Sequence, residues 1–100
     1  DIGARFALYI VSTEPRYGGT RVVLHFPNGF GASVLVIPPL FGETENGEVA
    51  VLSERNGWKT DYDTDITNDI ETNLSLSKVV NLLDKIAALD SEGYSQKLLN

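Results

Sequence analysis

A β-hairpin between residues 20 and 37 constrains the fold more than any other stretch of this chain. Two β-prone runs, residues 20–26 and 32–37, flank a five-residue connection with the sequence Pro-Asn-Gly-Phe-Gly. Proline cannot donate to a strand ladder, and the Asn-Gly pair followed by a second Gly supplies the positive φ angles that a tight reversal needs. The sequence therefore predicts two antiparallel strands joined at residues 27–31.

Three further runs are predicted to be strands: residues 4–12, 48–54 and 58–63. The first is apolar on both of its alternating faces, and residues 13–19, with one Pro and two Gly, are expected to form the loop that follows. The other two flank an Arg-Asn-Gly sequence that is typical of a hairpin turn. The polarity of residues 58–63 favours a position at the edge of the sheet.

A single amphipathic helix is predicted over residues 76–89, with Ser75 as its N-cap. Before it, residues 67–73 are expected to form one helical turn capped by Thr67. The apolar residues of the main helix recur with the i, i+3, i+4, i+7 spacing of one buried stripe. They are Leu76, Val79, Leu82, Leu83, Ile86 and Leu89.

These elements predict one α+β domain over residues 1–100: an antiparallel meander of about five strands with the C-terminal helix packed on one face. Because one helix covers only one face, we expect an apolar surface on the other, and hence a homo-oligomer. The alternative is that the C-terminal tail and the loop at residues 40–48 cover that face within one chain. The expected surface residues are Tyr9, Val11, Val23, Leu35, Ile37 and Leu52, or their alternates.

Composition narrows the classes of partner. The chain has 14 Asp and Glu against 8 Lys and Arg, a net charge of −6, and most acidic residues follow residue 42. An acidic chain without a basic stripe binds bulk nucleic acid poorly, although a few arginines can still hold a small anionic ligand. No apolar run approaches the roughly 20 residues that span a bilayer, and no signal peptide is evident. We therefore expect no membrane partner and a cytoplasmic location.

The sequence gives no sign of an enzyme. There is one histidine and no cysteine, so neither a two-histidine metal site nor a thiolate site can be assembled from one chain, and we expect no Ser-His-Asp relay. The glycine pairs do not match a phosphate-binding loop of the nucleotide-hydrolase type. We accordingly expect no catalytic residue, no metal and no cofactor.

An acidic run at residues 61–71 places five oxygen-bearing residues at odd positions of a calcium-loop pattern: Asp61, Asp63, Asp65, Thr67 and Asp69. The pattern then fails, because Ile66 stands where the loop needs glycine and Thr72 where it needs glutamate. A solvated strand end leading into a turn is the better interpretation. Alternatively, the carboxylates of Asp61, Asp63 and Asp65 imitate phosphate spacing and bind a nucleic-acid site on another protein.

A second group of residues is the preferred candidate for ligand binding. It lies in the first connection, in the second predicted strand and at the hairpin tip, and aromatic rings beside arginines suit stacking on a base and capture of a phosphate. Two interpretations stay open: either this group binds a ligand, or the ring at the hairpin tip folds back onto the core and the arginines are surface charges. The residues are Arg16, Tyr17, Arg21, His25, Asn28 and Phe30.

The hairpin sequence Phe-Pro-Asn-Gly-Phe-Gly-Ala-Ser-Val at residues 26–34 resembles a family of short, mostly uncharacterised accessory proteins of tailed bacteriophages. The resemblance extends to a Glu-x-Ala-Val-Leu strand at residues 48–52, a Tyr-Asp-Thr-x-Ile-Thr-x-Asp turn at 62–69 and the helix at 75–89. Members often have Pro where Asp65 stands here, and a more acidic first helical turn.

The resemblance implies a protein that acts stoichiometrically on a host component in the host cytoplasm. One version is an oligomeric sponge that sequesters a nucleotide-type immune signal, through the arginines and aromatic residues named above. Another is an acidic inhibitor that resembles anti-CRISPR proteins and binds a host defence complex through Asp61, Asp63 and Asp65. A minor structural phage protein is a third possibility.

Overall fold

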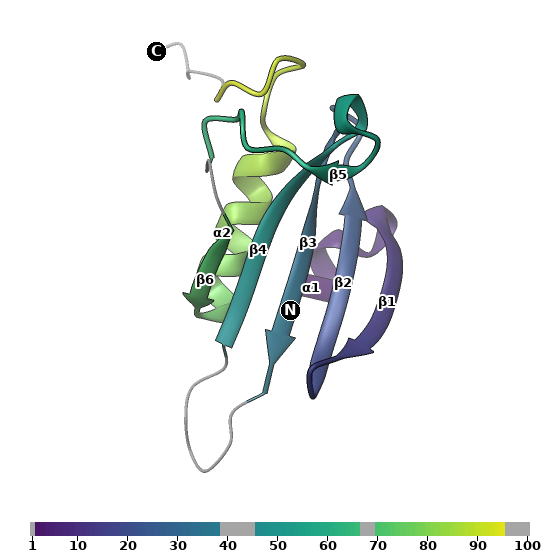
Figure 1. The fold of residues 1–100 in the computed structure, drawn as a ribbon, viewed down its shortest axis with the longest axis vertical. Coiled ribbons are helices and arrows are strands. Elements are labelled where there is room, and N and C mark those ends of the chain that lie inside the picture. Colours follow the sequence, from purple (N-terminus) through teal and green to yellow (C-terminus); the bar gives the residue numbers. More distant parts are fainter. Residues whose placement is uncertain (1, 39–45, 67–69, 96–100) are drawn as a thin grey trace.

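The structure, a computed structural model, describes residues 2–38, 46–66 and 70–95 as a sheet with its helices on one face (Figure 1). The strands lie in the order β1-β2-β3-β4-β5, with β6 also paired to β4, and every pairing is antiparallel. The expected α+β class is confirmed, with six strands in the sheet. The elements are α1 (Ile2–Phe6), the 3-10 turn η1 (Ala7–Tyr9), β1 (Ile10–Arg16), β2 (Gly19–His25), β3 (Phe30–Ile37), β4 (Asn46–Ser53), the 3-10 turn η2 (Glu54–Asn56), β5 (Lys59–Thr60), β6 (Glu71–Leu74) and α2 (Leu76–Ala87).

The predicted hairpin forms the centre of the sheet. Strands β2 and β3 pair in a register that places Leu24 opposite Ala32 and His25 opposite Gly31. Gly29 has a φ of 88°, as the tight turn requires. Gly31 is needed for another reason: a Cβ atom there would collide with the carbonyl oxygen of Leu24 across the ladder.

The predicted strand at residues 4–12 is wrong over its first six residues, which form α1 and η1. Phe6 is buried and packs edge-to-face on Phe26, with ring centroids 5.9 Å apart, and Tyr9 packs on the same ring at 5.4 Å. Leu8, which an extended chain would place on the same face as Phe6, is 93% exposed. Long-range packing around Phe26 therefore overrides the local strand propensity. The strand β1 instead runs through residues 13–16, which we expected to be loop.

The two short segments that pair with the outer edge of β4 also differ from expectation. Of residues 58–63 only Lys59 and Thr60 form a strand, because η2 occupies the turn and Trp58 takes a left-handed φ of 61°. Residues 71–73, expected to belong to one helical turn, lie instead in β6, which pairs with β4. The proposed cap Thr67 lies outside the described residues.

The predicted main helix is confirmed as α2, which begins after its N-cap Ser75 and ends two residues earlier than expected. The hydroxyl of Ser75 accepts a hydrogen bond from the backbone N–H of Lys78 at 3.3 Å. The apolar stripe of α2 packs on β3 and β4, and Phe6 joins the same core. Completely buried members of this core are Leu24, Ala32, Val34, Val79, Leu83 and Ile86.

Both helices therefore pack on the same side of the sheet, and in the described part of the chain no helix covers the other side (Figure 1). We call this other side the open face. It is less apolar than expected: Val23 and Leu52 are 8% and 4% exposed, Leu35 and Ile37 are half-buried, and of the expected residues only Val11 is exposed. Tyr9 does not belong to the open face, because it packs on the core.

Candidate functional site

Side chains from four consecutive strands line up in rows across the open face. Strand register places Glu14 opposite Arg21, Arg21 opposite Leu35, and Leu35 opposite Glu48. A neighbouring row contains Val23, Ser33 and Ala50. The backbone positions of Arg21 and Glu48 therefore lie one strand to either side of the apolar Leu35, with neighbouring strands about 4.8 Å apart.

A surface hollow of about 260 Å³ lies over these rows, and we call it the sheet hollow. Its floor is apolar, while charged and aromatic groups form its walls. Three of the sequence-predicted ligand-binding residues meet in it. Its lining consists of Arg16, Tyr17, Arg21, Ser33, Leu35, Glu48, Ala50 and Ile70.

Tyr17 occupies a strained position at the rim of the sheet hollow. It and Gly18 form the two-residue turn between β1 and β2, with φ angles of 52° and 76°. Such a turn favours Asn-Gly, and a tyrosine in the left-handed region costs about 1–2 kcal/mol. The ring is 74% exposed, so it gains little from packing in return. The guanidinium carbon of Arg16 lies 5.3 Å from its centroid.

Arg21 is held flat against the open face. Its Nε donates to the hydroxyl of Ser33 at 2.9 Å, and its Nη1 donates to the carboxylate of Glu14 at 3.1 Å. Arg16 lies 3.7 Å from the same carboxylate and makes a looser contact. Both arginines thus retain N–H donors that can bind an anion in a bidentate manner.

Glu48 supplies the acceptor in the sheet hollow. Its side chain is half-buried, and within residues 2–38, 46–66 and 70–95 neither a hydrogen bond nor an ion pair engages its carboxylate. Glu48 was not among the residues predicted from the sequence, and neither were Ser33, Leu35, Ala50 and Ile70. The alternation of β3 was a usable signal for Ser33 and Leu35, whereas Ile70 required the tertiary fold.

The other three candidates lie away from the sheet hollow. His25 stacks on Trp58, with ring centroids 3.6 Å apart and an angle of 9° between planes. Phe30 is 1% exposed and belongs to the core, so its ring folds back onto the core, as the second interpretation expected of this one residue. Asn28 donates to the carbonyl oxygens of Ile86 and Leu89 at 2.9 and 3.0 Å, where α2 ends.

A larger hollow, of about 430 Å³, lies beside Asn28 and Phe30 and is also lined by Arg55. Size does not make it the better candidate, because the side-chain donors of Asn28 and Arg55 in its lining are already engaged within the chain. The amide of Asn28 serves α2, and the guanidinium of Arg55 binds Asp61. The sheet hollow is the better candidate, since among the described residues it combines unengaged donors with an unengaged acceptor.

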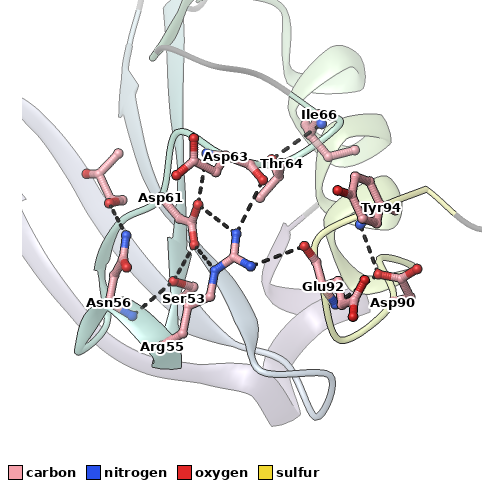
Figure 2. A network of polar contacts seen from close by, with 11 residues as sticks. Ser53, Arg55, Asn56, Asp61, Asp63, Thr64, Ile66, Asp90, Glu92 and Tyr94 are labelled. Carbon is pink, nitrogen blue, oxygen red and sulfur yellow. Dashed lines mark hydrogen bonds and ion pairs between the residues drawn. The ribbon is translucent and has the colours of Figure 1, made fainter.

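Asp61 is the centre of a polar network rather than part of an acidic surface (Figure 2). It is 2% exposed and accepts hydrogen bonds from the hydroxyl of Ser53 at 2.7 Å, from Nε and Nη2 of Arg55 at 2.6 and 3.1 Å, and from the backbone N–H of Asp63. The hydrogen bonds from Arg55 lower the pKa of Asp61 to about 2, against the opposing effect of burial. The expected three-carboxylate surface is therefore wrong for Asp61.

Asp63 and Asp65 are exposed, and Asp65 accepts a hydrogen bond from the backbone N–H of Ser95 at 2.8 Å. In the described part of the chain no three His, Cys, Asp or Glu side chains gather as metal ligands do. Two residues of the calcium-loop pattern, Thr67 and Asp69, lie outside that part.

Among the described residues no helix has the length and apolar character needed to cross a bilayer. Comparisons with protein-family models, curated proteins and solved structures found no match to this chain.

Proposed function

We propose that the protein works by stoichiometric binding, as a sponge that sequesters a small nucleotide-type immune signal in the sheet hollow. The observation that carries this proposal is the convergence of Arg16, Tyr17 and Arg21 on one hollow. Guanidinium groups bind phosphate in a bidentate manner, and an exposed tyrosine ring stacks on a base. We expect no turnover of the ligand.

The strain at Tyr17 supports the same proposal. An unfavourable backbone conformation that packing does not repay is typical of functional positions. Here it holds an exposed ring beside Arg16, at the rim of the sheet hollow. The exposed ring and the two arginines line the same hollow, so one nucleotide can contact all three.

We further propose that the binding form is a homo-oligomer in the host cytoplasm and that the role is phage-type counter-defence. The open face and the outer edge of β1 support the oligomer, because a second copy could roof the shallow sheet hollow. The counter-defence role rests on the resemblance of the hairpin at residues 26–34. Native mass spectrometry should give a species heavier than the 10.9 kDa chain. A folded monomer at every concentration would contradict the oligomer.

Thermal unfolding with a panel of cyclic dinucleotides and ADP-ribose derivatives tests the binding proposal. A ligand that binds only the folded state raises Tm. We expect at least one member to do so, and Arg16→Ala to abolish the rise. Arg5→Ala is the matched control, because Arg5 forms its ion pair with Asp84 of α2, away from the open face. A panel without any effect, or an equal loss in the control, would refute the proposal.

A further inference from the structure

We propose that Glu48 makes the sheet hollow selective for a guanine base. The inference rests on the proposed function and specifies which nucleotide the site accepts. The two sides of the sheet hollow differ in charge. The arginines line one side, and Glu48 stands across Leu35 from Arg21.

Charge fixes the orientation of a nucleotide in such a site. The carboxylate of Glu48 repels phosphate, whereas Arg16 and Arg21 attract it. Two strand spacings, or about 10 Å, separate the backbone positions of Arg21 and Glu48. A nucleotide lying across Leu35 therefore directs its phosphate to the arginines and its base edge to Glu48.

The chemistry of the carboxylate then selects the base. An ionised carboxylate only accepts hydrogen bonds, through two adjacent oxygens. Guanine offers two adjacent donors on its Watson–Crick edge, the ring imino N–H and the exocyclic amino group. Adenine and cytosine each place an acceptor next to their amino group, and uracil flanks its single imino donor with two acceptors. Only guanine satisfies both oxygens without placing an acceptor against the carboxylate.

No contact competes with this role among the described residues, since neither a hydrogen bond nor an ion pair engages the Glu48 side chain there. Glu14 is the instructive contrast. It stands in the same row, but it is paired with Arg21 at 3.1 Å and lies on the phosphate side. Glu48 is therefore the carboxylate available for a base.

Calorimetric titration with guanosine, inosine and adenosine monophosphates, and with cyclic di-GMP and cyclic di-AMP, tests the inference. The guanine ligands should bind about tenfold or more tightly than their adenine counterparts. Inosine, which lacks the amino group, should fall between them. Glu48→Gln should remove the preference, because its amide offers one donor and one acceptor. Glu14→Gln should keep it.

The titrations distinguish a failure of the guanine inference from a failure of the proposed function. If guanine and adenine ligands bind equally, or if Glu48→Gln keeps the preference, the inference is overturned while the proposed function stands. If none of these ligands nor any ADP-ribose derivative binds, the proposed function fails and the inference fails with it. A guanine preference that only Glu48→Gln removes supports both.

Discussion

The guanidinium of Arg55 and the carboxylate of Asp61 form a two-pronged ion pair, with Nε–Oδ2 and Nη2–Oδ1 distances of 2.6 and 3.1 Å. The carboxylate is buried, whereas the side chain of Arg55 is 41% exposed. Arg55 also donates to the backbone oxygen of Glu92 and lies 5.3 Å from the ring centroid of Phe30. The pair therefore joins the end of β4 to the segment that follows α2 (Figure 2).

The ion pair predicts acid-sensitive stability. The pKa of Asp61 falls from 3.8 to about 2 on folding, so the charged carboxylate stabilises the fold above pH 4. This contribution, on the order of 2 kcal/mol, should be lost as the pH falls from 4 towards 2. Urea unfolding of the wild type and Asp61→Asn across that range checks it: the difference should be largest at neutral pH. A difference independent of pH would count against this role.

Asn28 should stabilise the junction between the hairpin and α2. Its amide donates to two carbonyl oxygens at the end of α2, and its Oδ1 accepts from the backbone N–H of Phe30 at 3.0 Å. Asn28→Ala should lower the free energy of unfolding by about 2 kcal/mol, because it leaves these groups without a partner. Asn28→Asp keeps the acceptor and loses the donors, so chemical denaturation should find it unstable too. A stable Asp variant would show that the helix contacts contribute little.

Replacement by alanine should cost much more stability at Gly31, in β3, than at Gly29, in the hairpin turn. Gly29→Ala introduces a left-handed alanine into open space and should cost about 1 kcal/mol. Gly31→Ala should cost considerably more, because the new methyl group meets the backbone of Leu24 and the ladder must shift. Thermal unfolding of the two variants side by side gives the comparison. Equal losses would mean that the strands separate easily at this point.

Replacing Tyr17 should raise the stability of the fold and weaken ligand binding. Tyr17→Asn relieves the left-handed strain and removes a mostly exposed ring, so it should raise the free energy of unfolding by roughly 0.5–1 kcal/mol. The same variant should weaken nucleotide binding, because the stacking surface is gone. Tyr62→Asn is a control for the loss of an exposed tyrosine, since Tyr62 is 48% exposed and does not line the sheet hollow. A Tyr17 variant that is less stable would contradict the strain argument.

The parts of the fold that were predictable are those fixed by neighbouring residues. The hairpin follows from Asn28-Gly29 between β-prone runs, and α2 follows from its apolar spacing and the cap at Ser75. The N-terminal segment was not predictable in this way. Its conformation depends on Phe26 and on the Arg5–Asp84 ion pair, whose members are 79 residues apart.

The candidate site likewise contains residues that lie close together in the sequence and one, Glu48, that only the tertiary fold brings in. Arg16, Tyr17 and Arg21 are close in sequence, and one hairpin brings them together. Glu48 joins them only through the register of β3 on β4, which the sequence alone does not fix. The prediction of an acidic surface failed for a related reason. Asp61 is buried and binds Arg55, which lies on the far side of a turn.

The alternation of the central strands has a consequence for how this protein can evolve. In β2, β3 and β4, residues of the core alternate along the strand with residues that line the sheet hollow. Successive side chains point to opposite faces, so changes on one face leave the packing of the other untouched. The residues that line the sheet hollow, and with them the ligand preference that we propose for it, can therefore diverge among descendants of this chain while the scaffold stays constant.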